Sequence, residues 1–479
     1  MPDQLVAITS SSVWLPSKTA PSPATLIASL SAGTILSILP GKLARADLPE
    51  PVEQFIDAGD QWILPGLVDC HVHLNEPGRT EWEGFRTGTI AAVSGGVTTL
   101  IDMPLNAIPP TTTVENLNLK LDAAKGQCFV DVGFWGGVIP NNEKDLKPLV
   151  KAGVKGFKSF LCESGVEEFP KVNEEEVLIA MKELEEAKSL FLFHAELEEP
   201  QQPHAHASDA AHADTSSPQD PASYSTFLSS RPSSLEDSAI SLILRCASKH
   251  PSLRTHIVHL SASSALKTLQ QARTVAKLPI TVETCFHYLC LNSEQISKGE
   301  TLFKCCPPIR NDDNREKLWQ GLLEGTIDFI VSDHSPCVTE LKNLSSGDFM
   351  TAWGGIGGLG LGLSLLWSEC RRREIGMERV LEWCSSRPAK QVGLDMKKGG
   401  LFVGGDADFV VFDPEAQFTV DKTSLHFKNR ASPYEGMTLN GIVRETWLRG
   451  RKVWDRQLVA EQGGSGLVEQ GSARGELLL

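Results

Sequence analysis

The sequence predicts an α/β protein built on a (β/α)8 TIM barrel, with a small β-sandwich domain formed by both termini. Through the middle of the chain, apolar runs of strand length alternate with helical segments, which is typical of a parallel sheet. Eight such runs can be counted, and eight suggests a closed barrel. Both ends of the chain show instead short strand-like segments broken by proline, glycine and serine, without a long helical period.

The apolar runs set the expected order of the barrel. They fall at residues 66–70, 97–101, 130–134, 154–157, 190–193, 255–258, 280–283 and 329–331. Between them, Asn173 is placed to cap a helix over residues 174–188, and Ser233 with Glu236 resembles a capping pair. We therefore expect a barrel over residues 66–395 and a β-sandwich over residues 1–65 and 396–460. A His/Ala/Ser-rich insertion at 200–222 and a flexible tail at 461–479 complete the expected organisation.

Composition excludes several classes of protein. The chain of 479 residues carries 45 Lys and Arg against 60 Asp and Glu, a net charge of −15. This acidic balance argues against a nucleic-acid partner or an anionic membrane, since both require clustered cations. No uncharged apolar stretch long enough to span a membrane is present, and the first residues lack a secretory signal. Eleven scattered cysteines favour reduced thiols in the cytoplasm, and a peroxisomal location stays open.

The strongest local signal for chemistry is the segment Asp69-Cys-His71-Val-His73, at the end of the first apolar run. Side chains two residues apart on a strand point to the same face. The imidazoles of His71 and His73 can therefore bind one metal ion.

Other runs also end in residues that can bind metal. In a barrel the carboxyl ends of the strands meet on one face, where active sites lie. The sequence thus predicts a metal site from residues on several strands: His71, His73, Lys158, His194, His259 and Asp333. His256 and His334 are expected on the opposite strand faces, and His250 and His287 are assigned structural roles.

Lys158 is an unusual member of this set, because an ammonium group has no lone pair. A lysine that is buried near positive charge loses its proton more easily and can then react with CO2. The resulting carbamate is a carboxylate-like bridge between two metals. The alternative is a lysine at the edge of the core that pairs with a carboxylate. Aspartate, histidine and carbamate ligands suit Zn(II) and similar ions.

Together these residues resemble the amidohydrolase superfamily, specifically its cyclic amidohydrolase branch and, within it, the allantoinases. The resemblance covers roughly residues 60–455. It rests on five motifs, at residues 69–84, 102–106, 156–160, 283–288 and 332–336, of which the run Asn-Glu-Pro-Gly-Arg-Thr-Glu-Trp-Glu-Gly at 75–84 is the most specific. Phe286 departs from the pattern, which has proline there.

The resemblance implies a metal-dependent hydrolase that opens the cyclic amide of allantoin to give allantoate. It implies two divalent metals, with zinc favoured and Co, Mn or Ni open, held by His71, His73, carboxylated Lys158, His194, His259 and Asp333. Asp333 would act first as a base and then as an acid. Asn106 and Ser335 would contact the substrate ring, and relatives of this kind are commonly homotetramers.

Two kinds of alternative remain. Dihydroorotases resemble the chain but usually carry arginine two residues after the second histidine, where it binds a substrate carboxylate; here the residue is Asn75. Allantoin has no carboxylate, so a neutral amide is the better match. A hydantoinase or dihydropyrimidinase activity is a further alternative. The other class is a non-enzymatic scaffold, as found among relatives that have lost ligands, but here every expected ligand position is filled.

Overall fold

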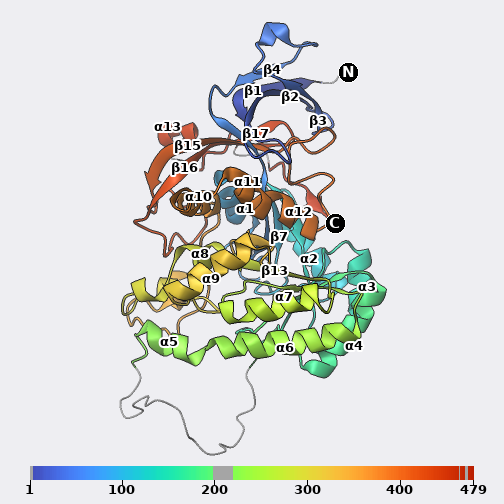
Figure 1. Cartoon of the computed structure of the whole chain (residues 1–479), viewed down its shortest axis with the longest axis vertical. Coiled ribbons are helices and arrows are strands. Elements are labelled where there is room, and N and C mark those ends of the chain that lie inside the picture. Colours follow the sequence, from blue (N-terminus) through green and yellow to red (C-terminus); the bar gives the residue numbers. More distant parts are fainter. Residues whose placement is uncertain (1–3, 198–219, 463, 470–472) are drawn as a thin grey trace, which may run out of the picture.

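The computed structural model describes residues 4–197, 220–462, 464–469 and 473–479. Figure 1 shows a β-rich region at one end of the molecule and a region of helices around parallel strands at the other. The predicted insertion at 200–222 lies outside the described residues except for its last three. Among the described residues, no helix is long and apolar enough to cross a membrane. All eleven cysteines are free.

The β-rich region combines strands from both ends of the chain, as predicted. Its strands form one mixed eight-stranded sheet in the order β17-β16-β15-β5-β1-β2-β3, with β4 paired to β1. The antiparallel pair β5–β15 joins the two ends, with Leu64 opposite Val410. The strands are β1 (Leu5–Val13), β2 (Ser22–Ser29), β3 (Ile35–Pro40), β4 (Gln54–Asp57), β5 (Trp62–Pro65), β15 (Phe409–Thr419), β16 (Thr438–Leu448) and β17 (Arg451–Asp455).

The middle of the chain forms parallel strands, also as predicted. One sheet has the order β14-β13-β12-β11-β10-β9, and a second has the order β18-β8-β7-β6. The strands are β6 (Leu67–Val72), β7 (Val97–Asp102), β8 (Asp131–Phe134), β9 (Gly136–Gly137), β10 (Phe157–Phe160), β11 (Leu190–His194), β12 (Arg254–Ile257), β13 (Ile280–Cys285), β14 (Phe329–Val331) and β18 (Leu477–Leu478). Seven predicted runs coincide with strands. The fourth was placed three residues too early, because Val154 lies in the connection before β10.

The two parallel sheets meet along both edges. Only Trp135 separates β8, which pairs with β7, from β9, which pairs with β10. At the other edges, Val72 of β6 forms a parallel bridge with His334, three residues after β14. Nearly every residue of these strands is buried, as expected for parallel strands covered on both faces.

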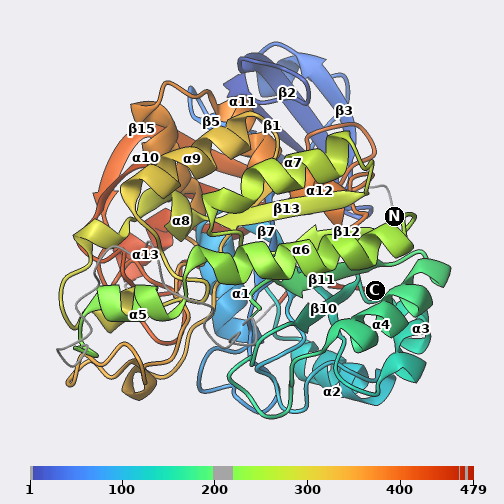
Figure 2. The same ribbon diagram turned by 60° about the horizontal axis from the view of Figure 1, so that its bottom comes forward.

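Helices cover the outside of the parallel strands. Figure 2 shows α6 and α7 lying along β11, β12 and β13. The α-helices are α1 (Phe85–Ser94), α2 (Val114–Ala124), α3 (Glu143–Lys151), α4 (Glu174–Glu186), α5 (Tyr224–Ser230), α6 (Ser233–Lys249), α7 (Leu266–Thr274), α8 (Phe286–Cys290), α9 (Asp312–Leu323), α10 (Gly362–Arg372), α11 (Met377–Leu381), α12 (Arg387–Gln391) and α13 (Arg456–Gln462).

The sequence predicted capping residues at the starts of two helices, α4 and α6. Asn173 caps α4 as predicted: its side chain accepts from the Glu176 N–H at 3.0 Å, and Glu176 accepts from the Asn173 N–H at 2.8 Å. The capping pair expected at Ser233 was wrong. Pro232 takes the cap position of α6, and Glu236 turns inward to bind Arg310 at 2.8 Å.

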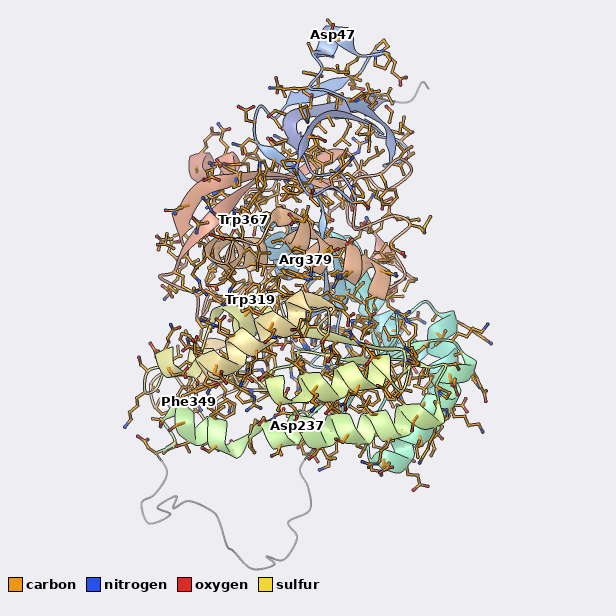
Figure 3. All side chains as sticks on the ribbon, in the orientation of Figure 1. Asp47, Asp237, Trp319, Phe349, Trp367 and Arg379 are labelled. Carbon is orange, nitrogen blue, oxygen red and sulfur yellow. The ribbon has the colours of Figure 1, made fainter. Side chains whose placement is uncertain are left out.

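Aromatic side chains pack α9 against its neighbouring helices. Trp319 of α9, labelled in Figure 3, is fully buried and donates its indole N–H to the Leu289 carbonyl at 3.0 Å. Its ring packs edge-on against that of Trp383. This packing fixes α9 against α8 and against the helical turn Glu382–Ser386.

The end of the chain makes a contact that the sequence did not indicate. Within the segment predicted as a flexible tail, β18 pairs in parallel with β8, with Leu477 opposite Val132. The Gly475 N–H donates to the Cys128 carbonyl at 2.8 Å. The described part of the tail thus extends the sheet that contains β6 and β7.

Candidate metal centre

The predicted ligands come together at the carboxyl ends of the parallel strands. His71 lies on β6 with His73 just after it, Lys158 on β10 and His194 at the end of β11. His259 and Asp333 each follow a strand by two residues, after β12 and β14. All six side chains are buried: His71, His73, Lys158, His194, His259 and Asp333. The strands therefore deliver the residues from distant parts of the chain to one place.

Three of these side chains form a first group of ligand atoms. Oδ1 of Asp333 lies 3.2 Å from Nε2 of His71 and 3.5 Å from Nε2 of His73. Two ligands of a tetrahedral zinc ion with bonds of 2.0–2.1 Å are about 3.3 Å apart. The group therefore matches the spacing that a divalent metal requires.

A second group lies on the neighbouring strands. Nδ1 of His194 is 3.0 Å from Nε2 of His259, and the two rings meet edge to face. Burial lowers the pKa of both imidazoles, and the charge of Lys158 lowers them further. Both rings are therefore neutral near pH 7, the form in which histidine binds metal. The ring of His259 also touches the first group, at 5.3 Å from the His71 ring centroid.

Lys158 has the environment that the carbamate hypothesis requires. Its Nζ is buried and has no hydrogen-bond partner within the described ranges. Burial lowers its pKa to about 8, although Asp333 and Glu283 act in the opposite direction. The alternative, a lysine that pairs with a carboxylate, does not match this geometry. An amine without a partner among metal-type ligands instead fits a group that acquires a ligand atom by modification.

Asp333 adopts a backbone conformation that is uncommon for residues other than glycine, with a φ of 44°. His259 does the same, with a φ of 38°. Such conformations cost energy and cluster at functional sites. Burial would raise the pKa of Asp333, but the rings of His71, His73 and His259 hold it well below its usual range. Asp333 is therefore an ionised acceptor in the middle of the cluster.

Two glutamates orient the histidines, and the sequence analysis gave neither a role. Glu283 of β13 lies 2.5 Å from Nδ1 of His71, and Glu196 lies 2.7 Å from Nε2 of His194. A carboxylate on the distal ring nitrogen fixes the tautomer of a histidine that binds metal. One signal was present in the sequence: Glu196 follows His194 by two residues, on the same face of an extended segment.

Of the four histidines that were predicted to lie outside the ligand set, three form hydrogen bonds through their rings. His334 accepts from the backbone N–H groups of Gly358 and Leu359, and His250 binds Glu185 at 2.8 Å. His256 binds the other oxygen of Glu283, at 3.0 Å.

His287 is the exception. It is fully buried, and both of its ring nitrogens lack a partner in the described part of the chain. One of these ring nitrogens lies within 4.8 Å of ligand atoms of Asp333 and Cys285. This histidine therefore lies beside the cluster, although the sequence analysis gave it a structural role.

The predicted substrate contacts also lie at the cluster. Nδ2 of Asn106 is 3.3 Å from Nδ1 of His73, and the Ser335 hydroxyl donates to Asp333 at 2.9 Å. Asn75, which distinguishes this chain from dihydroorotases, is buried, and its Oδ1 has no partner among the described residues. The cluster thus has amide and hydroxyl groups beside its ligand atoms.

A cavity opens near the residues that surround His194. Its volume is about 470 Å³, and Cys162, Glu163, Lys171 and Arg231 are among the residues that line it. The Cys162 sulfur lies within 4.8 Å of ligand atoms of His194 and Glu196. Arg231 binds Glu196 at 2.5 Å. The cavity therefore reaches the residues that support His194.

Comparison with known proteins agrees with this geometry. The family model described as "Amidohydrolase family" matches residues 62–453. An allantoinase of Saccharomyces cerevisiae is 50% identical over 438 residues, which are 90% of this chain and 92% of the relative. An allantoinase of Streptomyces avermitilis is 46% identical over 95% of this chain and 96% of its own length.

The fold is also similar to that of solved structures. An L-hydantoinase (dihydropyrimidinase) from Arthrobacter aurescens superposes with a TM-score of 0.85 at 26% identity, covering 98% of this chain and 99% of that one. This family implies metal-dependent catalysis, and the buried clusters of metal-binding side-chain types agree with it. The chain therefore belongs to the amidohydrolase family.

Proposed function

We propose that the protein is an allantoinase, a hydrolase that opens the hydantoin ring of allantoin to give allantoate. The observation that carries this proposal is identity of 46–50% to allantoinases over at least 90% of the chain. The ligand set adds support, because all six expected positions carry side chains suited to a metal-dependent hydrolase. This completeness argues against a scaffold that has lost its chemistry.

The architecture proposed for this enzyme is a closed (β/α)8 barrel. Two observations support closure. The consecutive strands β8 and β9 pair with β7 in one sheet and with β10 in the other, and Val72 forms a bridge with His334 at the opposite edges. We place the barrel at residues 66–395 and a β-sandwich at 1–65 and 396–460. A homotetramer in the cytoplasm is the expected state of the protein.

Two divalent metals, most simply zinc, would be held by the two groups of ligand atoms. His71 and His73 would bind one, His194 and His259 the other, with Asp333 on the first. The neutral amine of Lys158 would attack CO2: an N–C bond would form, one C=O π pair would move to oxygen, and the nitrogen would lose a proton, which would give the side chain a carboxylate able to hold metal. When bound, the pair supplies an activated water and a Lewis acid for the ring carbonyl.

The protein's own side chains handle the proton. Asp333 is ionised and held by the Ser335 hydroxyl, so it can accept a proton from the attacking water. Asp333 then returns the proton to the ring nitrogen that leaves. Asn106 and Ser335 orient the ring. Oδ1 of Asn75, which has no hydrogen-bond partner among the described residues, can accept from an N–H of a neutral substrate.

The test is a comparison of substrates on the metal-loaded enzyme. Turnover is measured with allantoin, hydantoin, dihydrouracil and dihydroorotate under the same conditions. We expect the highest kcat/KM for allantoin. Highest activity on dihydroorotate would overturn the proposal, and highest activity on hydantoin or dihydrouracil would favour the hydantoinase or dihydropyrimidinase alternative.

A further inference from the structure

Arg79 lies in the connection between β6 and α1, close to the ligands but not among them. Its side chain is 17% exposed, so most of the guanidinium is enclosed by the protein. It packs over the Trp82 ring, 5.1 Å from the centroid, and Trp82 in turn packs edge-on against Trp353. These contacts hold the guanidinium in one orientation.

Arg79 holds the backbone carbonyls of two asparagines. Its backbone N–H donates to the Asn75 carbonyl at 3.1 Å, and Nη1 of its guanidinium donates to the Asn106 carbonyl at 2.8 Å. Both asparagines have left-handed backbones, with φ of 62° and 67°. Such a conformation persists only where surrounding contacts maintain it. The guanidinium therefore helps to hold the backbone from which the buried Asn106 amide projects, whereas the Asn75 contact is made by the main chain.

The same nitrogen reaches a third connection. Nη1 of Arg79 also binds Glu168, which lies between β10 and α4. One guanidinium thus joins the connections that follow β6, β7 and β10. Two of these strands carry His71 and Lys158, and the third precedes Asn106.

We propose that Arg79 is a positioning residue that fixes the amide group of Asn106 for the cyclic substrate. This inference rests on the proposed function, because it assigns that amide to the substrate ring. The guanidinium suits the role because it is planar and has several N–H donors in fixed directions. A lysine in its place offers a single flexible ammonium, which cannot hold the Asn106 carbonyl and Glu168 in the same geometry.

The first experiment replaces Arg79 and a matched arginine elsewhere. Arg273 is the control because its pair with Asp328 has side-chain exposures of 19% and 26%, against 17% and 24% for Arg79 and Glu168. It also binds two backbone carbonyls, outside the metal cluster. For Arg79→Gln and Arg79→Lys we expect kcat/KM to fall about 10- to 100-fold with metal content unchanged.

Arg273→Gln should lose stability without this loss of turnover per folded molecule. If Arg79→Gln and Arg273→Gln have the same kcat/KM, the positioning role is wrong. If Arg79→Gln instead loses metal, Arg79 supports the ligands rather than the Asn106 amide, and the inference is also overturned.

A double-mutant cycle tests whether Arg79 acts through Asn106. If it does, Arg79→Gln should change kcat/KM by less than about threefold once Asn106→Ala is present, because coupled residues are not additive. A full, independent loss in that background would overturn the inference. Failure of the wild type on allantoin contradicts the proposed function instead; the cycle is then run on the fastest cyclic amide, with the same expected loss.

Discussion

Two buried lysines show how differently this protein uses the same side chain. Lys398 lies between the β-rich region and the parallel strands, where its Nζ is 2.5 Å from Asp131 and 2.7 Å from both Asp406 and Asp408. Lys158 lies at the opposite ends of the parallel strands and has no hydrogen-bond partner in the described residues. Lys398 is surrounded by three carboxylates, whereas the part of the chain that the structure describes offers Lys158 only the face of the Phe160 ring.

The surroundings shift the pKa values of the two lysines in opposite directions. Burial disfavours the charge on Lys398, but the three carboxylates raise its pKa above the ordinary value. Burial lowers the pKa of Lys158 to about 8. The three aspartates around Lys398 are spaced closely enough to hold a metal, yet the ammonium already occupies their centre. A cluster of ligand-type residues thus indicates a metal site only when no side chain neutralises it.

The largest expected effect comes from removing the unpaired lysine. Lys158→Ala should reduce turnover to the detection limit, because the ligand that we propose for Lys158 would be lost. Short carboxylic acids added to the variant should restore part of the activity by supplying that carboxylate. The readout is turnover of allantoin with and without acetate, and full activity in Lys158→Ala without any addition would contradict the carbamate role.

Asp333→Asn should be the next most severe change at this site. The amide cannot accept and return the proton, so kcat should fall by about 10²- to 10⁴-fold. Circular dichroism should show an unchanged fold, since Asn has nearly the same shape. Turnover within a few-fold of the wild type would reduce Asp333 to a spectator.

At the ion pairs of Lys398, the expected change is in stability. Lys398→Met leaves Asp131 and Asp408 buried with less compensation, which should lower the free energy of unfolding by about 3–5 kcal/mol. Lys147, whose partners Glu183 and Glu186 are more exposed, is the control, and Lys147→Met should leave the free energy of unfolding nearly unchanged. Urea unfolding measures both variants, and equal losses would remove the contrast between the clusters.

A smaller effect is expected for the glutamate behind His71. Glu283→Gln should weaken metal affinity by about 10- to 100-fold, because the neutral amide orients and polarises the ring less strongly. Glu185→Gln, at the His250 pair away from the cluster, provides the control. Chelator competition measures the affinity, and an unchanged value in Glu283→Gln would show that Glu283 does not support the ligand.

The smallest effect concerns pH. Because the proton leaves Lys158 near pH 8 instead of pH 10.5, the neutral amine accumulates as the pH rises toward 8. At fixed dissolved CO2, metal reconstitution of the apoprotein should quicken by about tenfold from pH 7 to 8.5 and then level off. A rate that still increases tenfold per unit between pH 9 and 10 would indicate an ordinary lysine.

The sequence predicted which residues come together at the strand ends but not what surrounds them. Residues such as His71 and Asp333 could be assigned because parallel strands end on one face, so position along the chain predicts position in space. The Glu283 contact joins residues 212 positions apart, and the Arg79 contact joins residues 89 apart. No periodicity encodes such pairs, because they depend on how the connections fold over the strand ends.

The same limit applies to the second lysine. Asp131 starts a parallel strand, whereas Lys398 precedes the first strand of the C-terminal group, and nothing in either local pattern links them. Their contact follows from how the β-rich region packs on the parallel strands. Whether a buried lysine has a structural or a chemical role depends on its partners. Those partners could not be predicted from the sequence.

The most direct test of the central claim is the metal content of three purified proteins, measured by mass spectrometry of the elements. The account predicts about two divalent ions per chain in the wild type, a loss of metal in Lys158→Ala, and about two ions per folded chain in Lys398→Met. Two ions retained in Lys158→Ala, or metal lost only in Lys398→Met, would contradict it.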